Sequence, residues 1–154
     1  MIEIKEISID ELSTFWEEHI SYLTDDEIIS DEDIEYFSGD EYRDIIKNHM
    51  LRKENRHHLV YFYDGEKKIG ASSFCTYQSE DGKCFILDFW VFTGYRGKGT
   101  GHRCFDALEK YTREDGAIYY ELNSTREDSI RFWKSLGFVE NGKDEYEMPL
   151  FIRK

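Results

Sequence analysis

The sequence predicts a mixed α/β domain in which antiparallel strand pairs precede a strand, loop and helix unit. Two Asp-Gly pairs, at residues 64–65 and 81–82, follow runs rich in β-branched and aromatic residues and are typical of hairpin turns. The most apolar stretch, residues 84–92, leads into a glycine-rich loop and then into residues with helical spacing. A length of 154 residues fits one compact domain over residues 1–154.

The elements of the first half follow from hydrophobic periodicity. Isoleucines that roughly alternate with polar residues predict a first strand over residues 2–9. Asp10 is expected to cap a helix whose apolar stripe runs to residue 24. A second helical stripe covers residues 42–50. The turn at 64–65 joins two further strands, at 59–63 and 68–77, and the turn at 81–82 leads into the next strand.

The second half continues with a strand at 84–92, which is interrupted only by Asp88 and is expected to be buried on both faces. A helix with apolar positions from 104 to 111 stops at Gly116, and residues 117–122 form the next strand.

The last elements are a helix and two short strands. A capping box, Ser124 with Glu127 or Thr125 with Asp128, opens the helix, which ends at Gly137. The strands follow at 138–139 and 146–152, and a proline at position 149 indicates that the final one is an edge strand.

Charge and composition exclude several classes of protein. With 20 basic and 33 acidic side chains the net charge is −13, which argues against a nucleic-acid partner. No apolar run approaches the roughly 20 residues of a membrane helix, and the first residues do not resemble a signal peptide, so we expect a cytoplasmic protein with no membrane partner. Cys75, Cys84 and Cys104 are odd in number and lack Cys-x-x-Cys spacing, which indicates buried thiols and no metal site.

The loop over residues 95–102 has the features of a phosphate site. Gly97, Gly99 and Gly101 allow close backbone approach at the start of a helix, and Arg96 and Lys98 add cationic donors. A tight turn without a ligand would seldom need glycines at three alternate positions. The spacing matches neither a Walker A loop nor the Gly-x-Gly-x-x-Gly dinucleotide fingerprint, so neither ATP or GTP bound in that way nor NAD is expected.

The pattern Arg96-x-x-Gly99-x-Gly101 resembles the pyrophosphate loop of the general N-acetyltransferase (GNAT) superfamily. Val91 precedes Arg96 at the family's spacing, and the stretch that closes in Leu136-Gly137-Phe138 also resembles the family; the similarity covers residues 84–138. It implies a mixed, mostly antiparallel, V-shaped sheet of six to seven strands with about four helices. The two central strands, residues 84–92 and 117–122, would splay apart around acetyl-CoA.

The resemblance also implies a set of cofactor-binding residues. The pyrophosphate would lie on the backbone of Arg96, Gly97, Lys98, Gly99, Thr100 and Gly101. The pantetheine would pair with the backbone at Trp90 and Val91 as an added strand. Arg126 stands where the family often has an asparagine that contacts the cofactor. A guanidinium at this position can reach the pantetheine or a phosphate of the cofactor.

The chemistry of direct acetyl transfer requires a neutral amine, a stabilised oxyanion and protonation of the leaving thiolate. Val91 is the candidate whose N–H stabilises the oxyanion, and the cysteines take no part. The family commonly has a tyrosine as proton donor where this chain has Trp133. The indole is expected to bind the cofactor, by packing against it or by donating a hydrogen bond, but it cannot be a general acid. Tyr119, Tyr120 and Tyr146 are possible substitutes.

Two carboxylates compete for the role of general base. Glu121 lies twelve residues before Trp133, where related ribosomal-protein acetyltransferases have a catalytic glutamate. Asp88 is the only charge in its apolar strand, which favours a perturbed pKa. Each is alternatively a solvated or hydrogen-bonded strand residue.

The acceptor side is expected to involve the acidic segment. Residues 25–44 carry ten acidic side chains, which indicates either a cationic amine acceptor, small molecule or peptide, or a solubilising surface. The alternatives to an enzyme are a non-catalytic acyl-CoA-binding regulatory module, suggested by Trp133, and an interaction domain with a vestigial loop. The oligomeric state stays open and includes a homodimer.

Overall fold

The computed structural model describes residues 1–26 and 28–154; Glu27, one of the ten acidic residues of the 25–44 segment, and the side chain of Asp31 lie outside it. In the described part, seven strands form one sheet in the order β1-β2-β3-β4-β5-β7-β6. Every neighbouring pair is antiparallel except β4 and β5, which are parallel. The strands are β1 (Ile2–Glu6), β2 (His57–Asp64), β3 (Lys67–Thr76), β4 (Lys83–Val91), β5 (Tyr119–Asn123), β6 (Val139–Lys143) and β7 (Pro149–Arg153). The mixed, mostly antiparallel sheet expected from the sequence is confirmed.

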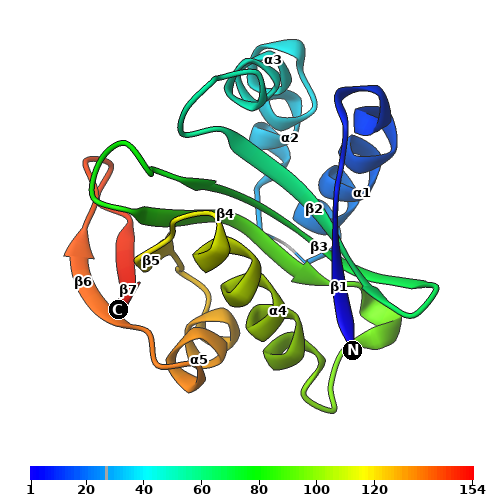
Figure 1. The fold of residues 1–154 in the computed structure, drawn as a ribbon. Coiled ribbons are helices and arrows are strands. Elements are labelled where there is room, and N and C mark those ends of the chain that lie inside the picture. Colours follow the sequence, from blue (N-terminus) through cyan, green and yellow to red (C-terminus); the bar gives the residue numbers. More distant parts are fainter. Residues whose placement is uncertain (27) are drawn as a thin grey trace.

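Helices cover both faces of this sheet. They are α1 (Leu12–Asp25), α2 (Asp31–Phe37), α3 (Asp40–Met50), α4 (Thr100–Glu114) and α5 (Glu127–Ser135). Figure 1 shows α4 and α5 on one side of the sheet and α1, α2 and α3 on the other. Alternate residues of β2 supply the two cores: Val60 and Phe62 pack with α4 and α5, and Leu59 and Tyr61 pack with α1 and α3.

The first strand is shorter than its isoleucine pattern predicted. It ends at Glu6, and Ser8 begins a 3-10 turn over Ile9–Glu11 that leads into α1. The carboxylate of Glu11 accepts hydrogen bonds from the backbone N–H of Ser8 at 3.1 Å and from its hydroxyl at 2.9 Å. Ser8 is the N-cap residue of the 3-10 turn and Glu11 that of α1, so the prediction that Asp10 caps the helix was wrong.

The acidic segment contains a helix that periodicity did not predict. The short helix α2 lies between α1 and α3, which gives five α-helices in the described residues where about four were expected. Its seven residues are too few to display a full apolar stripe. In β4, Leu87 is 45% exposed, so this strand is not buried on both faces over its whole length.

Two predictions near the C-terminus were also wrong. Neither expected capping box forms, because α5 begins at Glu127, the hydroxyl of Ser124 bonds to that of Ser129 at 2.9 Å, and the backbone N–H of Ser129 donates to Asp128 at 2.8 Å. The final strand β7 is interior, since it lies between β5 and β6. Pro149 is tolerated there because it is the first residue of β7, where its missing N–H interrupts no central ladder.

Candidate active site

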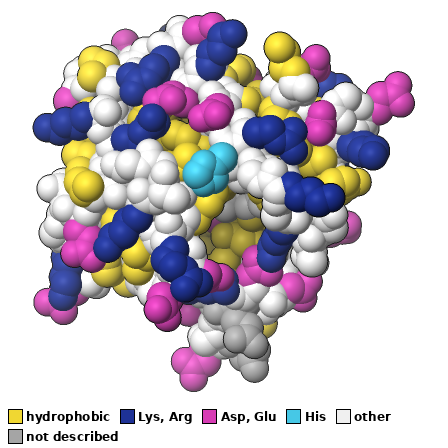
Figure 2. All heavy atoms as spheres, turned by 90° about the horizontal axis from the view of Figure 1, so that it is seen from below, with side chains coloured by type: hydrophobic (Ala, Val, Ile, Leu, Met, Phe, Trp, Pro, Cys, Tyr) yellow, Lys and Arg dark blue, Asp and Glu magenta, His cyan; other side chains and the backbone are white. Residues whose placement is uncertain are grey.

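The candidate site is the gap that opens where β4 and β5 separate. These strands pair only from Lys83 to Phe85 on β4 and from Tyr119 to Glu121 on β5. Beyond them a cavity of about 480 Å³ lies between residues 87–91 of β4 and residues 123–126, at the end of β5 and just after it. The face seen in Figure 2 is hollowed, with hydrophobic side chains inside the hollow and charged ones at its rim. The splay implied by the family resemblance is therefore present, and the backbone of β4 borders it.

The glycine loop forms one end of this cavity. Gly97 and Gly99 have φ angles of +89° and +76°, which glycine adopts without strain. A Cβ built on either residue meets no atom within 4 Å, so the loop is open on the side where a side chain would project. Among the described residues, the backbone N–H groups of Gly97, Lys98, Gly99 and Gly101 have no hydrogen-bond acceptor. Unpaired donors at the N-terminus of the fifteen-residue helix α4 are suited to an anion.

Gly101 has a different role from the other two glycines. Its φ is not positive, but a Cβ there would lie 2.7 Å from Cε1 of Phe132 on α5. The residue therefore allows α4 and α5 to approach each other beside the loop. Thr100 stabilises the turn, because its N–H and its hydroxyl both donate to the carbonyl of Gly97, at 3.1 and 2.8 Å.

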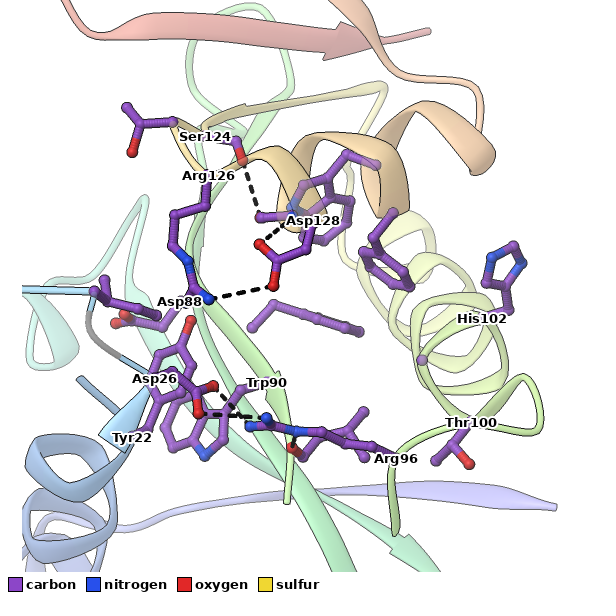
Figure 3. A pocket seen from close by; sticks show the side chains of 18 of the residues that line it. Tyr22, Asp26, Asp88, Trp90, Arg96, Thr100, His102, Ser124, Arg126 and Asp128 are labelled. Atoms are coloured by element: carbon purple, nitrogen blue, oxygen red, sulfur yellow. Dashed lines mark hydrogen bonds and ion pairs between the residues drawn. The ribbon is translucent and has the colours of Figure 1, made fainter. Parts of the chain in front are cut away.

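Arg96 connects the loop to two other elements. Its Nε donates to the carbonyl of Val91 at 2.8 Å, and its guanidinium forms two hydrogen bonds with Asp26 at the end of α1, at 2.7 and 3.3 Å (Figure 3). Asp26 was not singled out from the sequence. The side chain of Lys98 is exposed and does not line the cavity, so only its backbone belongs to the site.

One wall of the cavity is aromatic and comes from α1 and β4. Tyr22 stacks on Trp90 with ring centroids 4.5 Å apart and planes 4° from parallel. Burial raises the pKa of the Tyr22 phenol, and the nearby carboxylates of Asp88 and Asp26 raise it further. Tyr22 therefore stays protonated near neutral pH and can donate a hydrogen bond into the cavity. Its sequence signal was its spacing of three residues from His19 on the apolar stripe of α1.

Asp88 enters the cavity from the middle of β4. Its side chain is 11% exposed, and its Oδ2 lies 3.2 Å from Nε2 of the buried His19. In Figure 3 the side chains of Asp88, Tyr22 and Arg126 point toward one another. The candidate base on β4 is thus brought to the site together with a phenol that the sequence analysis missed.

The opposite wall comes from the start of α5. Arg126 is its N-cap residue, lines the cavity and pairs with Asp128 at 3.2 Å. Trp133 also lines the cavity but is mostly buried, packing against Phe89 and Phe132 with ring centroids 5.2 and 4.9 Å apart. Its indole is thus part of the aromatic core beneath the site.

Glu121 is the candidate that the structure leaves out of the cavity. It lies on β5 where this strand still pairs with β4, and its carboxylate is 3.6 Å from the ammonium of Lys83. It is absent from the residues that line the cavity. The general-base role of Glu121 stays a prediction that this position does not favour.

The three tyrosines considered as substitute proton donors also lie elsewhere. Tyr120 is fully buried with its hydroxyl 2.6 Å from that of Thr112, Tyr119 donates to Asp81 at 2.5 Å, and Tyr146 is 78% exposed. None lines the cavity.

The cysteines are buried and free, as expected. Burial raises the pKa of Cys84 and of Cys104 to about 12, which makes both poor nucleophiles.

The acidic residues next to the site come mainly from α1. A recess of about 330 Å³ adjoins the cavity, and its floor includes Trp90 and Phe92. Its four carboxylates are those of Glu17, Glu18, Asp25 and Asp26. Of the described acidic side chains in the 25–44 segment, only Asp25 and Asp26 line either space.

Two features are absent from the described residues. No helix among them combines the length and the apolarity needed to cross a bilayer. Within residues 1–26 and 28–154, no group of three or more metal-ligating side chains is arranged to hold a metal ion.

Comparison with known proteins gives relatives in sequence and in structure. In sequence, the chain is 30% identical over 96 residues to the "Uncharacterized N-acetyltransferase YjcF" of Bacillus subtilis (strain 168), a match that covers 62% of this chain and 64% of that protein. The chain therefore matches just under two thirds of the length of this relative.

Similar solved structures cover nearly the whole chain. The PaiA N-acetyltransferase of Thermoplasma acidophilum, in complex with coenzyme A, has a TM-score of 0.74 and 20% identity and covers 100% of this chain and 99% of its own. The acetyltransferase of Streptococcus agalactiae 2603 has a TM-score of 0.69 and 17% identity and covers 99% of this chain and 97% of its own. At these identities the likeness shows that the fold is shared.

The family model described as "Acetyltransferase (GNAT) family" matches residues 13–138, which is well over half of the chain and includes the glycine loop and both strands of the splay. The chain belongs to the acetyltransferase (GNAT) family.

Proposed function

We propose that this protein is an acetyl-CoA-dependent N-acetyltransferase that transfers an acetyl group directly to a primary amine of a cationic small molecule or peptide. The observation that carries the proposal is the cavity between β4 and β5, which has unpaired loop N–H groups at one end and the Asp88 carboxylate within it. Family membership and the coenzyme A bound to a protein of similar fold support the choice of cofactor.

The residues present fit coenzyme A. Its phosphates match the open backbone donors of Gly97 to Gly101. At Trp90 and Val91, the edge of β4 that no longer pairs with β5 suits an extended pantetheine. Arg126 adds a cation on the facing wall. When bound, acetyl-CoA supplies the thioester that is attacked by the amine. We retain Val91 as the candidate donor to the oxyanion.

The acceptor side relies on Asp88 and Tyr22. The carboxylate of Asp88 attracts an ammonium ion and accepts its proton, which releases the neutral amine for attack. As the bond between the amine nitrogen and the acetyl carbon forms and the carbon–sulfur bond breaks, the nitrogen loses a second proton and the sulfur gains one. The products are the acetylated amine and the free thiol of coenzyme A. Tyr22, held protonated by burial and by neighbouring carboxylates, donates a hydrogen bond on this side of the cavity.

The acidic recess favours a cationic acceptor. It adjoins the cavity at Tyr22, Asp26 and Trp90, so an amine that enters past it meets carboxylates before reaching Asp88. Glu32 and Asp33 on α2 do not line this route, so the proposal rests on the α1 carboxylates.

One observation favours a second candidate, a non-catalytic acyl-CoA-binding module. Trp133 replaces the usual proton donor and is packed into the aromatic core, where it cannot act as an acid. Such a module would bind coenzyme A and acetylate no amine.

An amine panel separates the two candidates. Acetyl-CoA is incubated with small diamines, amino sugars and basic peptides, and thiol release and the mass of the product are measured. Gly99→Glu, which places a carboxylate in the open loop, should abolish both turnover and the rise in Tm caused by coenzyme A. Asp88→Asn should keep the Tm shift and lose turnover, whereas Glu121→Gln should keep both. Coenzyme A binding without turnover of any amine would favour the module.

A further inference from the structure

A histidine that the proposed chemistry does not use lies directly behind Asp88. His19 projects from α1, its side chain is 1% exposed, and its ring stacks on Phe15 and on Tyr42 with planes 15° and 5° from parallel. Its Nε2 is 3.2 Å from Oδ2 of Asp88. Nδ1, by contrast, is buried with no hydrogen-bond partner among the described residues.

This asymmetry determines the tautomer of the ring. A proton on Nδ1 would leave a buried donor unpaired, and on a charged imidazolium that cost would be larger still. A proton on Nε2 faces the Asp88 carboxylate 3.2 Å away. The surroundings therefore favour the tautomer that carries its proton on Nε2 and leaves a bare lone pair on Nδ1.

The same contact orients the carboxylate. Oδ2 of Asp88 faces the imidazole, while no described residue donates a hydrogen bond to Oδ1. The backbone is fixed too, because the hydroxyl of Ser72 donates to the Asp88 carbonyl at 2.7 Å. Asp88 lines the cavity, so its free oxygen is the one available to an incoming ammonium.

Titratable and charged groups from every neighbouring element surround this pair. The groups are Tyr22 and Asp26 on α1, Tyr42 on α3, His57 on β2, Arg96 in the glycine loop and Arg126 at the start of α5. Burial lowers the pKa of His57 to about 4, so this neighbour carries no charge near neutral pH. Tyr22 and Tyr42 are neutral there as well, because burial raises the pKa of each phenol.

The geometry points to His19 as a positioning residue that donates one hydrogen bond to Oδ2 of Asp88, fixes the rotamer of this carboxylate and directs its second oxygen to the acceptor amine. The inference rests on the proposed function for its kinetic consequence, but the state of the Asp88 carboxylate can be measured without any acceptor. In the reaction, one proton of the ammonium passes to the Asp88 carboxylate and later to solvent; His19 keeps its own proton throughout.

The first test is carbon-13 NMR of the Asp88 carboxyl in the free protein at neutral pH, assigned with Asp88→Asn. His19→Leu removes the donor, and His19→Gln places an amide N–H where Nε2 stood. We expect His19→Leu to move the carboxyl resonance of Asp88, since a hydrogen bond to this group is lost, and His19→Gln to restore most of the change. The matched control is Phe15→Leu, which disturbs the same aromatic cluster without touching Asp88.

A purely structural histidine predicts a different result. His19→Leu and Phe15→Leu would then change the unfolding free energy while the carboxyl resonance of Asp88 stayed in place, and this outcome would overturn the inference. A Gln variant with the same carboxyl resonance as the Leu variant would overturn it too. If Tm measurements show that His19→Leu does not fold, the comparison of wild type with His19→Gln and His19→Asn decides, because Asn places its amide short of the Nε2 position.

The second test uses an amine that the wild type acetylates. We expect kcat/KM to fall about tenfold in His19→Leu and to recover in His19→Gln. The double variant His19→Leu/Asp88→Asn should be no slower than Asp88→Asn alone, whereas multiplied losses would refute coupling through Asp88. If no amine is acetylated, the proposed function fails, and the carboxyl resonance of Asp88 still decides the role of His19.

Discussion

The ion pair between Arg96 and Asp26 predicts that an acidic side chain limits cofactor affinity. Arg96 is also held by its 2.8 Å hydrogen bond to the carbonyl of Val91, so it should keep its position when Asp26 is neutralised. Asp26→Asn would release the guanidinium to a phosphate. Because the Arg96 side chain is 41% exposed, the pair is worth only about 0.5 to 1 kcal/mol, which corresponds to a coenzyme A Kd lower by about two- to fivefold.

Isothermal titration calorimetry with coenzyme A measures this change directly. The matched control is Asp25→Asn, which removes the same charge one residue away, and no salt bridge of Asp25 is found among the described residues. A general charge effect would improve binding equally in both variants. Asp26→Asn should also lose its advantage in an Arg96→Gln background. Equal gains in both single variants, or weaker binding in Asp26→Asn, would refute the role of the pair.

Three further predictions concern stability and turnover. Gly70→Ala should lower the unfolding free energy by about 1 to 3 kcal/mol in urea titrations, because a Cβ there would lie 2.5 Å from the carbonyl oxygen of Trp90; unchanged stability would contradict it. Burial lowers the pKa of His57 from 6.5 to about 4, so between these pH values the unfolded chain binds more protons than the folded one. The unfolding free energy should therefore fall by about 3 kcal/mol as the pH drops from 6.5 to 4, and His57→Gln should lack this pH dependence. Tyr22→Phe should reduce kcat about tenfold while the KM for acetyl-CoA stays constant in steady-state assays; an unchanged kcat would exclude the phenol from the reaction.

The parts of the site that could be predicted are local in sequence. The glycine loop joins β4 to α4, and its glycines, its flanking bases and the helix that follows are all encoded within about a dozen residues. Local patterns of this kind survive folding because backbone conformation at Gly97 and Gly99 depends on the residues themselves.

The acceptor side could not be read in the same way because it is assembled from distant segments. Asp26 and Arg96 are 70 positions apart in the chain, and His19 reaches Asp88 from a helix whose stripe looked like ordinary core. Burial of this histidine is visible in the periodicity, but its partner depends on which face of β4 meets α1.

Glu121 illustrates a second limit. Successive side chains of a strand point to opposite faces, and the point at which β5 leaves β4 decides which residues border the gap. The pairing continues through Glu121, so the cavity begins at Asn123 instead. A sequence shows that a strand exists but not where its neighbour stops pairing with it.

The short ladder between β4 and β5 also affects how the domain opens. Only Lys83 to Phe85 pair with β5, so the sheet consists of a four-stranded unit, β1 to β4, and a three-stranded unit, β5 to β7, joined by three residue pairs and by the helices packed across them. Such units can open separately in hydrogen exchange. A ligand that touches the backbone of one unit and the α5 wall of the other would join them, so its binding should slow amide exchange in β6 and β7, far from any atom it contacts.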